Sequence, residues 1–259
     1  MLGRSAFFMK QAGQGKPIVI LEAGAGEDSM TWKNIIPAVA QFSQVMAYDR
    51  TGLGRSVGLP TPYTAMQLVD ELHGLLHASQ LEEPYLLVGH SLGALLCRLY
   101  TQQYRHEVAG LILLDGPHPD QGNRFTAALT QAGWQEHELI QSVLKMASGV
   151  APEQHPEGLD FAKSLAQVDQ TQTFGDLPLV VVSRGRSLVE TMPDLPAQAA
   201  IIFDRIWNRM QDELTMLSTR GVHLTAKRSG HYIHCDDPEL VVETIHQVVR
   251  TIRNGSPHE

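Results

Sequence analysis

Short runs of apolar and β-branched residues recur along the chain, and within each run the apolar residues are nearly continuous rather than alternating. Five runs are clear and a sixth is weaker: residues 17–21, 44–48, 85–88, 111–114 and 179–182, then 222–226. A strand that is apolar on both faces is buried on both faces, as in a parallel sheet covered by helices. The pattern therefore predicts a mostly parallel sheet between two helical layers.

Helical spacing of apolar residues fills most of the intervals between these runs, at residues 32–41, 64–79, 92–104 and 238–253. Such alternation of strand and helix is typical of a doubly wound α/β domain. The chain has 259 residues, enough for one large α/β domain or two small ones. Because no repeat or low-complexity linker interrupts the alternation, we expect one domain.

One interval between predicted strands is too long for a single crossover, because about sixty residues separate the fourth run from the fifth. The interval is rich in Gln and Ala, has helical spacing, and predicts two to four helices. We therefore expect residues 1–116 and 177–259 to form the core domain, with 117–176 inserted as a helical lid. An irregular stretch at 185–196 and a helix at 198–218 follow the fifth run.

A Gly-x-Ser-x-Gly sequence, Gly89 to Gly93, stands where a predicted strand ends and a predicted helix begins. A serine hydroxyl is a poor nucleophile unless it is exposed, near a base and beside hydrogen-bond donors. A sharp strand-to-helix turn gives that exposure and tolerates only small flanking residues. This position predicts Ser91 as a catalytic nucleophile.

A serine nucleophile needs a general base, and histidine has a suitable pKa. His231 follows the last predicted strand and precedes a helix that starts at Pro238 with Asp237 as its N-cap. A loop at this strand's carboxyl end lies on the same edge of the sheet as Ser91. We therefore expect His231 to be the base, with His234 as the nearest alternative.

Three of the other histidines, His90, His118 and His223, are expected to be structural, although His118 is also placed where it could line a pocket.

Acyl transfer also requires two backbone amides that bind the oxyanion, one of them from the residue after the nucleophile, here Leu92. The second is expected from the glycine-rich loop after the first long apolar run, where glycines allow close backbone approach to a ligand. Ala25 is the predicted donor, with Gly24 or Gly26 as alternatives.

Four segments together resemble the α/β-hydrolase superfamily, in particular its lidded serine esterase and haloperoxidase-like branch. They are Leu21-Glu22-Ala23-Gly24-Ala25-Gly26, Tyr48-Asp49-Arg50-Thr51-Gly52-Leu53-Gly54-Arg55-Ser56, Gly89 to Gly93, and Ser229-Gly230-His231. They follow the family order and span residues 17 to 250. The sequence departs from the family in having Glu22-Ala23-Gly24 where many relatives carry His-Gly, and its strands before residue 17 look abbreviated.

The resemblance leaves the acid of the triad open. Relatives usually place an aspartate after the penultimate strand, but the loop Ser183 to Ser187 contains no carboxylate. Asp115, at the end of the strand that follows the nucleophile helix, occupies a position that serves as the acid in some branches. We expect Asp115 to be the acid, while Asp194 and a weakened dyad stay open as alternatives.

The composition limits the function classes. The net charge of −8 argues against a nucleic-acid surface. The two cysteines, Cys97 and Cys235, indicate neither a disulfide framework nor a zinc site. The chain shows no apolar run of membrane-spanning length and no signal segment, so we expect a cytoplasmic protein without membrane contacts. It predicts no metal, no organic cofactor and no particular oligomeric state.

The sequence thus predicts a serine hydrolase of small carboxylic esters that acts through an acyl-enzyme intermediate. A lactonase, a C–C bond hydrolase or a proline-type aminopeptidase would use the same triad. Glu136, Glu138 and Asp160 could bind the ammonium group of an aminopeptidase substrate. Dehalogenases and epoxide hydrolases are disfavoured because their nucleophile is an aspartate. A receptor for small molecules, built on the same scaffold with slow or no turnover, is the alternative outside enzymes.

Overall fold

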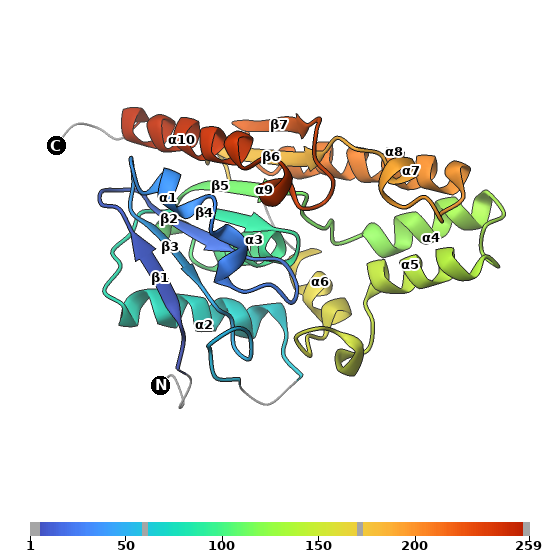
Figure 1. The fold of residues 1–259 in the computed structure, drawn as a ribbon, viewed down its shortest axis with the longest axis horizontal. Coiled ribbons are helices and arrows are strands. Elements are labelled where there is room, and N and C mark those ends of the chain that lie inside the picture. The colour runs from blue at the N-terminus through green and yellow to red at the C-terminus, as the bar shows by residue number, and fades with distance from the viewer. Residues whose placement is uncertain (1–5, 59–61, 170–172, 256–259) are drawn as a thin grey trace.

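A seven-stranded sheet runs through the computed structural model, which describes residues 6–58, 62–169 and 173–255 (Figure 1). The strand order is β1-β3-β2-β4-β5-β6-β7, and only β1 is antiparallel to its neighbour. The strands are β1 (Met9–Ala12), β2 (Ile18–Glu22), β3 (Val45–Tyr48), β4 (Tyr85–His90), β5 (Val108–Leu114), β6 (Leu179–Arg184) and β7 (Gly221–Ala226). All six predicted strands are present, so the mostly parallel α/β sheet is confirmed, and β1 was not predicted.

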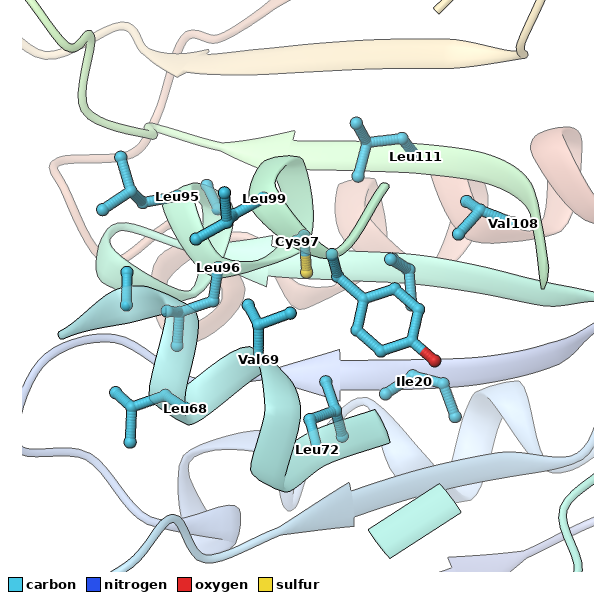
Figure 2. Close-up of a cluster of buried hydrophobic side chains, with 14 of the residues drawn as sticks. Ile20, Leu68, Val69, Leu72, Leu95, Leu96, Cys97, Leu99, Val108 and Leu111 are labelled. Carbon is cyan, nitrogen blue, oxygen red and sulfur yellow. The ribbon is translucent and has the colours of Figure 1, made fainter. Parts of the chain in front are cut away.

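Helices cover both faces of the sheet, as continuous apolar strands require. On one face lie α2 (Ala65–Ala78) and α3 (Leu92–Gln103), and on the other lie α1 (Ile36–Val39) and α10 (Pro238–Gly255). The residues of β2 alternate between two buried clusters, with Ile20 in the first and Val19 in the second. Figure 2 shows the first cluster, in which leucines of α2 and α3 pack together above the sheet.

The predicted helix at 32–41 is broken in the structure. A 3-10 turn, η1 (Ser29–Trp32), precedes the short α1, which has Pro37 in its first turn. Pro37 has no amide hydrogen to donate to the Lys33 carbonyl, so a regular α-helix cannot extend from residue 32 through this position, and α1 begins only at Ile36. The stretch 185–196, expected to be irregular, contains the short helix α7 (Leu188–Thr191), which Ser187 caps.

The segment between β5 and β6 is helical. It contains α4 (Gln121–Gln131), α5 (Glu138–Ser148), η3 (Pro152–Gln154) and α6 (Phe161–Asp169). Figure 1 shows α4 and α5 beyond the carboxyl ends of the parallel strands. A third apolar cluster joins them to α8 (Ala197–Thr215), with Phe125, Ile140 and Phe203 among its members. The remaining elements are η2 (Arg105–Glu107) and α9 (Ile233–Asp236).

Arg50 fastens the segment between β5 and β6 to the sheet. Its guanidinium is 2% exposed and donates five hydrogen bonds, as many as it has N–H groups. Two go to the Glu157 carboxylate at 2.8 and 2.6 Å and one to Glu22 Oε1 at 2.7 Å. The other two go to the carbonyls of Ala23 and Gly24 at 2.7 and 2.6 Å. One side chain therefore holds the glycine-rich loop and the segment between β5 and β6 together.

One positive charge cannot fully balance two buried carboxylates. Burial raises the pKa of Glu22 above its ordinary value, although Arg50 and the Tyr48 hydroxyl oppose that effect. Burial also acts on Glu157, but there the charge and hydrogen bonds of Arg50 prevail and the pKa is lowered. Glu157 Oε1 accepts a further hydrogen bond from the Gly26 amide at 2.8 Å. Glu157 is therefore held by two hydrogen bonds from Arg50 and one from the glycine-rich loop.

We expect Arg50→Lys to lower the free energy of unfolding by about 3–5 kcal/mol, because lysine has three donors and leaves buried acceptors unpaired. Urea denaturation of the purified variant measures this. Arg209→Lys is the control, since Arg209 is 81% exposed and pairs with Glu213 at 3.3 Å on the surface. Equal stability of the two variants would contradict the importance given to Arg50.

Candidate active site

Ser91 lies between β4 and α3 in a strained backbone conformation, with φ of 49° and ψ of −118°. This region is unfavourable for any residue with a Cβ, and such strain concentrates at functional sites. The Ser91 amide donates a hydrogen bond to the Leu114 carbonyl at 3.0 Å, which fixes the turn against β5. A Cβ at Gly89 would overlap the Gly93 backbone, and one at Gly93 would overlap the Glu22 carbonyl. Both glycines are therefore needed for the turn to form.

Asp115 directly follows β5 and is fully buried, also with a positive φ, of 44°. His231 Nδ1 donates a hydrogen bond to Asp115 Oδ2 at 2.7 Å. Asp115 Oδ1 accepts two more, from Trp207 Nε1 at 2.7 Å and from the Arg184 amide at 3.1 Å. Burial would raise the pKa of Asp115, but the hydrogen bond from His231 and the charge of Arg184 outweigh it and lower the pKa to about 2. The carboxylate is thus ionised when it meets the imidazole.

Arg184 and Trp207 were not predicted from the sequence. Arg184 is the last residue of β6, and its Nη1 lies 3.3 Å from Asp115 Oδ2. Trp207 reaches the same carboxylate from α8. The absence of a carboxylate from the 183–187 loop was visible in the sequence. The sequence did not show that Arg184 would face Asp115, because this contact depends on the pairing of β5 with β6.

The alternative residues for the base and the acid lie elsewhere. Within the described residues, no hydrogen bond or ion pair involves Asp194, which is exposed. His234 is buried, and its Nε2 lies 2.7 Å from Thr31 Oγ1 and 3.6 Å from Glu27 Oε1. The structure therefore brings His231 and Asp115 together and leaves Asp194 and His234 outside that contact.

His90 and Glu27 brace the loop that carries His231. The His90 ring is 1% exposed; its Nε2 lies 3.0 Å from the His231 carbonyl and its Nδ1 lies 2.9 Å from Glu27 Oε2. Burial lowers the pKa of His90 to about 4, although the hydrogen bond with Glu27 opposes that effect. Burial acts to raise the pKa of Glu27, but its contacts with His234 and His90 lower it. Glu27 was not predicted from the sequence.

The other two histidines expected to be structural have polar partners of their own. His118 Nε2 lies 3.6 Å from Glu213 Oε2, and His223 contacts Ser183 and Asp212 at 2.8 and 2.6 Å.

The amides of residues 24–26 in the glycine-rich loop differ in whether the described residues provide an acceptor for them. The Gly24 amide donates to Glu27 Oε2, and the Gly26 amide donates to Glu157 Oε1, each at 2.8 Å. No atom in the described part of the chain accepts from the Ala25 amide between them. Leu92 opens α3, where the first amides of a helix have no partner within the helix.

Glu27, His90 and His234 also form a group whose ligand atoms lie close enough together to bind a metal ion. Both carboxylate oxygens of Glu27 already accept hydrogen bonds within the protein. Oε2 accepts from the Gly24 amide and Oε1 accepts from the Thr31 hydroxyl. A metal ion here would have to displace contacts that hold the glycine-rich loop.

None of the helices in the described ranges is both long and apolar enough to cross a membrane.

Comparisons with known proteins agree with this architecture. Residues 16–137 match a family model described as the alpha/beta hydrolase fold. The uncharacterized protein YqjL of Bacillus subtilis (strain 168) is 30% identical over 231 residues, which cover 89% of this chain and 82% of that protein.

Two solved structures share the fold at low identity. A thermophilic esterase from Thermogutta terrifontis superposes with a TM-score of 0.64 at 19% identity, over 95% of this chain and 93% of that one. The enol-lactonase from Burkholderia xenovorans LB400 gives a TM-score of 0.62 at 18% identity, over 96% and 98%. From the sequence relatives and the observed sheet, this chain belongs to the α/β-hydrolase family.

Proposed function

We propose that this protein is a serine hydrolase that cleaves small carboxylic esters, with Ser91 as nucleophile, His231 as base and Asp115 as acid. The observation that carries the proposal is the 2.7 Å hydrogen bond between His231 Nδ1 and the buried Asp115 carboxylate. It occurs at the sheet edge where β4 delivers Ser91 and β5 delivers Asp115. A base that a buried carboxylate orients, at the same strand ends that carry a strained serine, supports activation of the hydroxyl.

In the proposed reaction, the Ser91 hydroxyl attacks the acyl carbonyl while His231 Nε2 takes the hydroxyl proton. The bond between His231 Nδ1 and Asp115 fixes the tautomer that leaves Nε2 free to accept, and the ionised carboxylate stabilises the imidazolium that forms. The protonated imidazole then returns the proton to the leaving alcohol. A water molecule, activated by His231 in the same way, attacks the acyl-enzyme and releases the acid.

The tetrahedral oxyanion would be bound by the amides of Ala25 and Leu92. Ala25 is favoured over Gly24 and Gly26 because the amides of both glycines already donate to carboxylates. Each donor of this kind contributes roughly 3 kcal/mol to the transition state. By holding the Ala23 and Gly24 carbonyls, Arg50 would keep the Ala25 amide pointing at the substrate.

We also propose that residues 117–176 act as a lid that sets substrate choice. Their helices α4 and α5 pack with α8 beyond the carboxyl ends of the strands, where open α/β sheets bind ligands. The ion pair between Glu157 and Arg50 fastens this segment to the glycine-rich loop. A movement of the lid would therefore shift the backbone amides of the proposed oxyanion site.

Hydrolysis of lactones, C–C bonds and proline-type peptides would use the same three side chains. Only assays with these substrates can distinguish these activities from ester hydrolysis. For the aminopeptidase alternative, Glu136 and Glu138 are exposed near the start of α5. The Asp160 carboxylate accepts a hydrogen bond from the Lys163 amide at the start of α6. The substrate panel described next tests this alternative beside the ester.

The proposal is tested by labelling with a fluorophosphonate probe and by turnover of a panel of esters, lactones and aminoacyl amides with varied acyl length. We expect labelling at Ser91 and the highest kcat/KM on a short-chain ester. Labelling without turnover of any substrate would instead favour a small-molecule receptor on a hydrolase scaffold.

Ser91→Ala should abolish labelling and lower kcat by about 10⁴-fold or more, because only binding and oxyanion stabilisation remain. Alanine fits the turn, so the thermal unfolding temperature should stay close to that of the wild type. Hydrolysis near the wild-type rate by pure Ser91→Ala protein would refute the mechanism.

Asp115→Asn should lower kcat by up to about 10⁴-fold with a smaller effect on KM, because an amide can hold His231 in the wrong tautomer. The asparagine oxygen can still accept from Trp207, which limits structural damage. Asp194→Asn is the matched control and should be close to wild type. The reverse pattern in steady-state kinetics would assign the acid to Asp194.

A further inference from the structure

A second group of convergent polar side chains lies at the opposite end of β5 from Asp115. His73 and His77 are one helical turn apart on α2, and Glu107 is the last residue of η2, which leads directly into β5. Since β5 carries Asp115 after its other end, the seven residues of the strand separate this group from the proposed catalytic residues. The proposed ester chemistry uses none of the three side chains.

Three ligand atoms of this group lie close to one another. His73 Nε2 lies 3.0 Å from Glu107 Oε1, and His77 Nε2 lies 3.3 Å from the same oxygen. The two Nε2 atoms are 2.9 Å apart. In a tetrahedral zinc site with bonds of 2.0–2.1 Å, ligand atoms are separated by roughly 3.3 Å, so the observed triangle is close to the size required.

Ordinary hydrogen bonds cannot satisfy all three contacts at once. An imidazole nitrogen carries either one hydrogen or one lone pair, and it points in a single direction in the plane of the ring. If His73 Nε2 donates to Glu107, the same atom cannot also accept from His77. A cation at the centre would instead receive a lone pair from each nitrogen and from the carboxylate oxygen.

Neighbouring side chains hold these ligands in place. The Tyr100 hydroxyl donates a hydrogen bond to Glu107 Oε2, which leaves Oε1 facing the histidines. The His73 ring stacks on Tyr104 with centroids 3.7 Å apart. Leu68, Val69 and Leu72 anchor α2 in the core (Figure 2). Such outer contacts orient the ligands of metal sites in proteins and set their affinity.

We propose that His73, His77 and Glu107 bind a divalent cation of the zinc class. Two imidazoles with one carboxylate suit Zn²⁺ better than Mg²⁺ or Ca²⁺, which prefer oxygen ligands. Glu107 is 4% exposed and His77 is 54% exposed, so the site is anchored on its protein side and open to solvent on the other. The exposed His106, whose Nε2 lies 3.8 Å from Glu107 Oε1, is placed to supply a fourth ligand in competition with water.

Such an ion would join α2 to the segment that enters β5, two elements that the core brings together from distant parts of the sequence. Its effect is therefore on stability rather than on the ester reaction, because a ligand that binds only the folded state raises the unfolding temperature. This inference is independent of the proposed function.

Isothermal titration with Zn²⁺ of the full-length protein, freed of metal by chelator and dialysis, tests the site. We expect one saturable equivalent and an unfolding temperature that rises with Zn²⁺. His77→Gln, at an exposed helix position that tolerates the change, and Glu107→Gln should each weaken binding by about 100-fold or more, since removing a ligand costs more than removing an outer contact. His106→Gln should have a smaller effect.

His234→Gln is the control, because His234 belongs to the separate group with Glu27 and His90. It should keep the Zn²⁺ equivalent and the shift in unfolding temperature. The proposal is overturned if the wild type shows no saturable binding. It is equally overturned if His77→Gln and Glu107→Gln bind as the wild type does, or if only His234→Gln loses the ion.

Discussion

The buried guanidinium of Arg50 is the contact on which the site depends most. It comes from the loop after β3, and its five donors reach Glu22 at the end of β2, two carbonyls of the glycine-rich loop, and Glu157 in the segment between β5 and β6. A loop of small residues has little side-chain packing of its own, so the hydrogen bonds of Arg50 fix its conformation instead of apolar contacts. The same contact links the loop to the segment proposed as a lid.

Two residues carry backbone strain at neighbouring strand ends, and the sheet holds both of them. The φ angles of Ser91 and Asp115 are positive, and the amides of both residues donate to carbonyls of the adjacent strand, Leu114 and Val182. Asp115 is further fixed by Arg184, Trp207 and His231, which come from three other segments. Strain of this kind persists only where surrounding contacts over-determine the conformation.

Most of the sheet could be predicted because its strands are apolar on both faces. A continuous apolar run can be recognised in the sequence of each strand without knowing which strands lie beside it. The helix expected at 32–41 forms only in part, as the short α1 with Pro37 in its first turn, and α7 was missed because four residues carry too little periodicity. The short edge strand β1 is polar in its middle and half-buried, so its sequence resembles a loop.

The sequence by itself determined the local parts of the candidate site. The glycines on both sides of Ser91, the loop that carries His231 and the strand that ends at Asp115 all follow from short-range chemistry, and they led to residues that the structure brings to one edge of the sheet. Only the tertiary structure decided which carboxylate meets His231, and it is Asp115 rather than Asp194. The partners Arg184, Trp207, Glu27 and Glu157 likewise had no local signal, because a buried ion pair or hydrogen bond joins residues whose positions depend on strand order and helix packing.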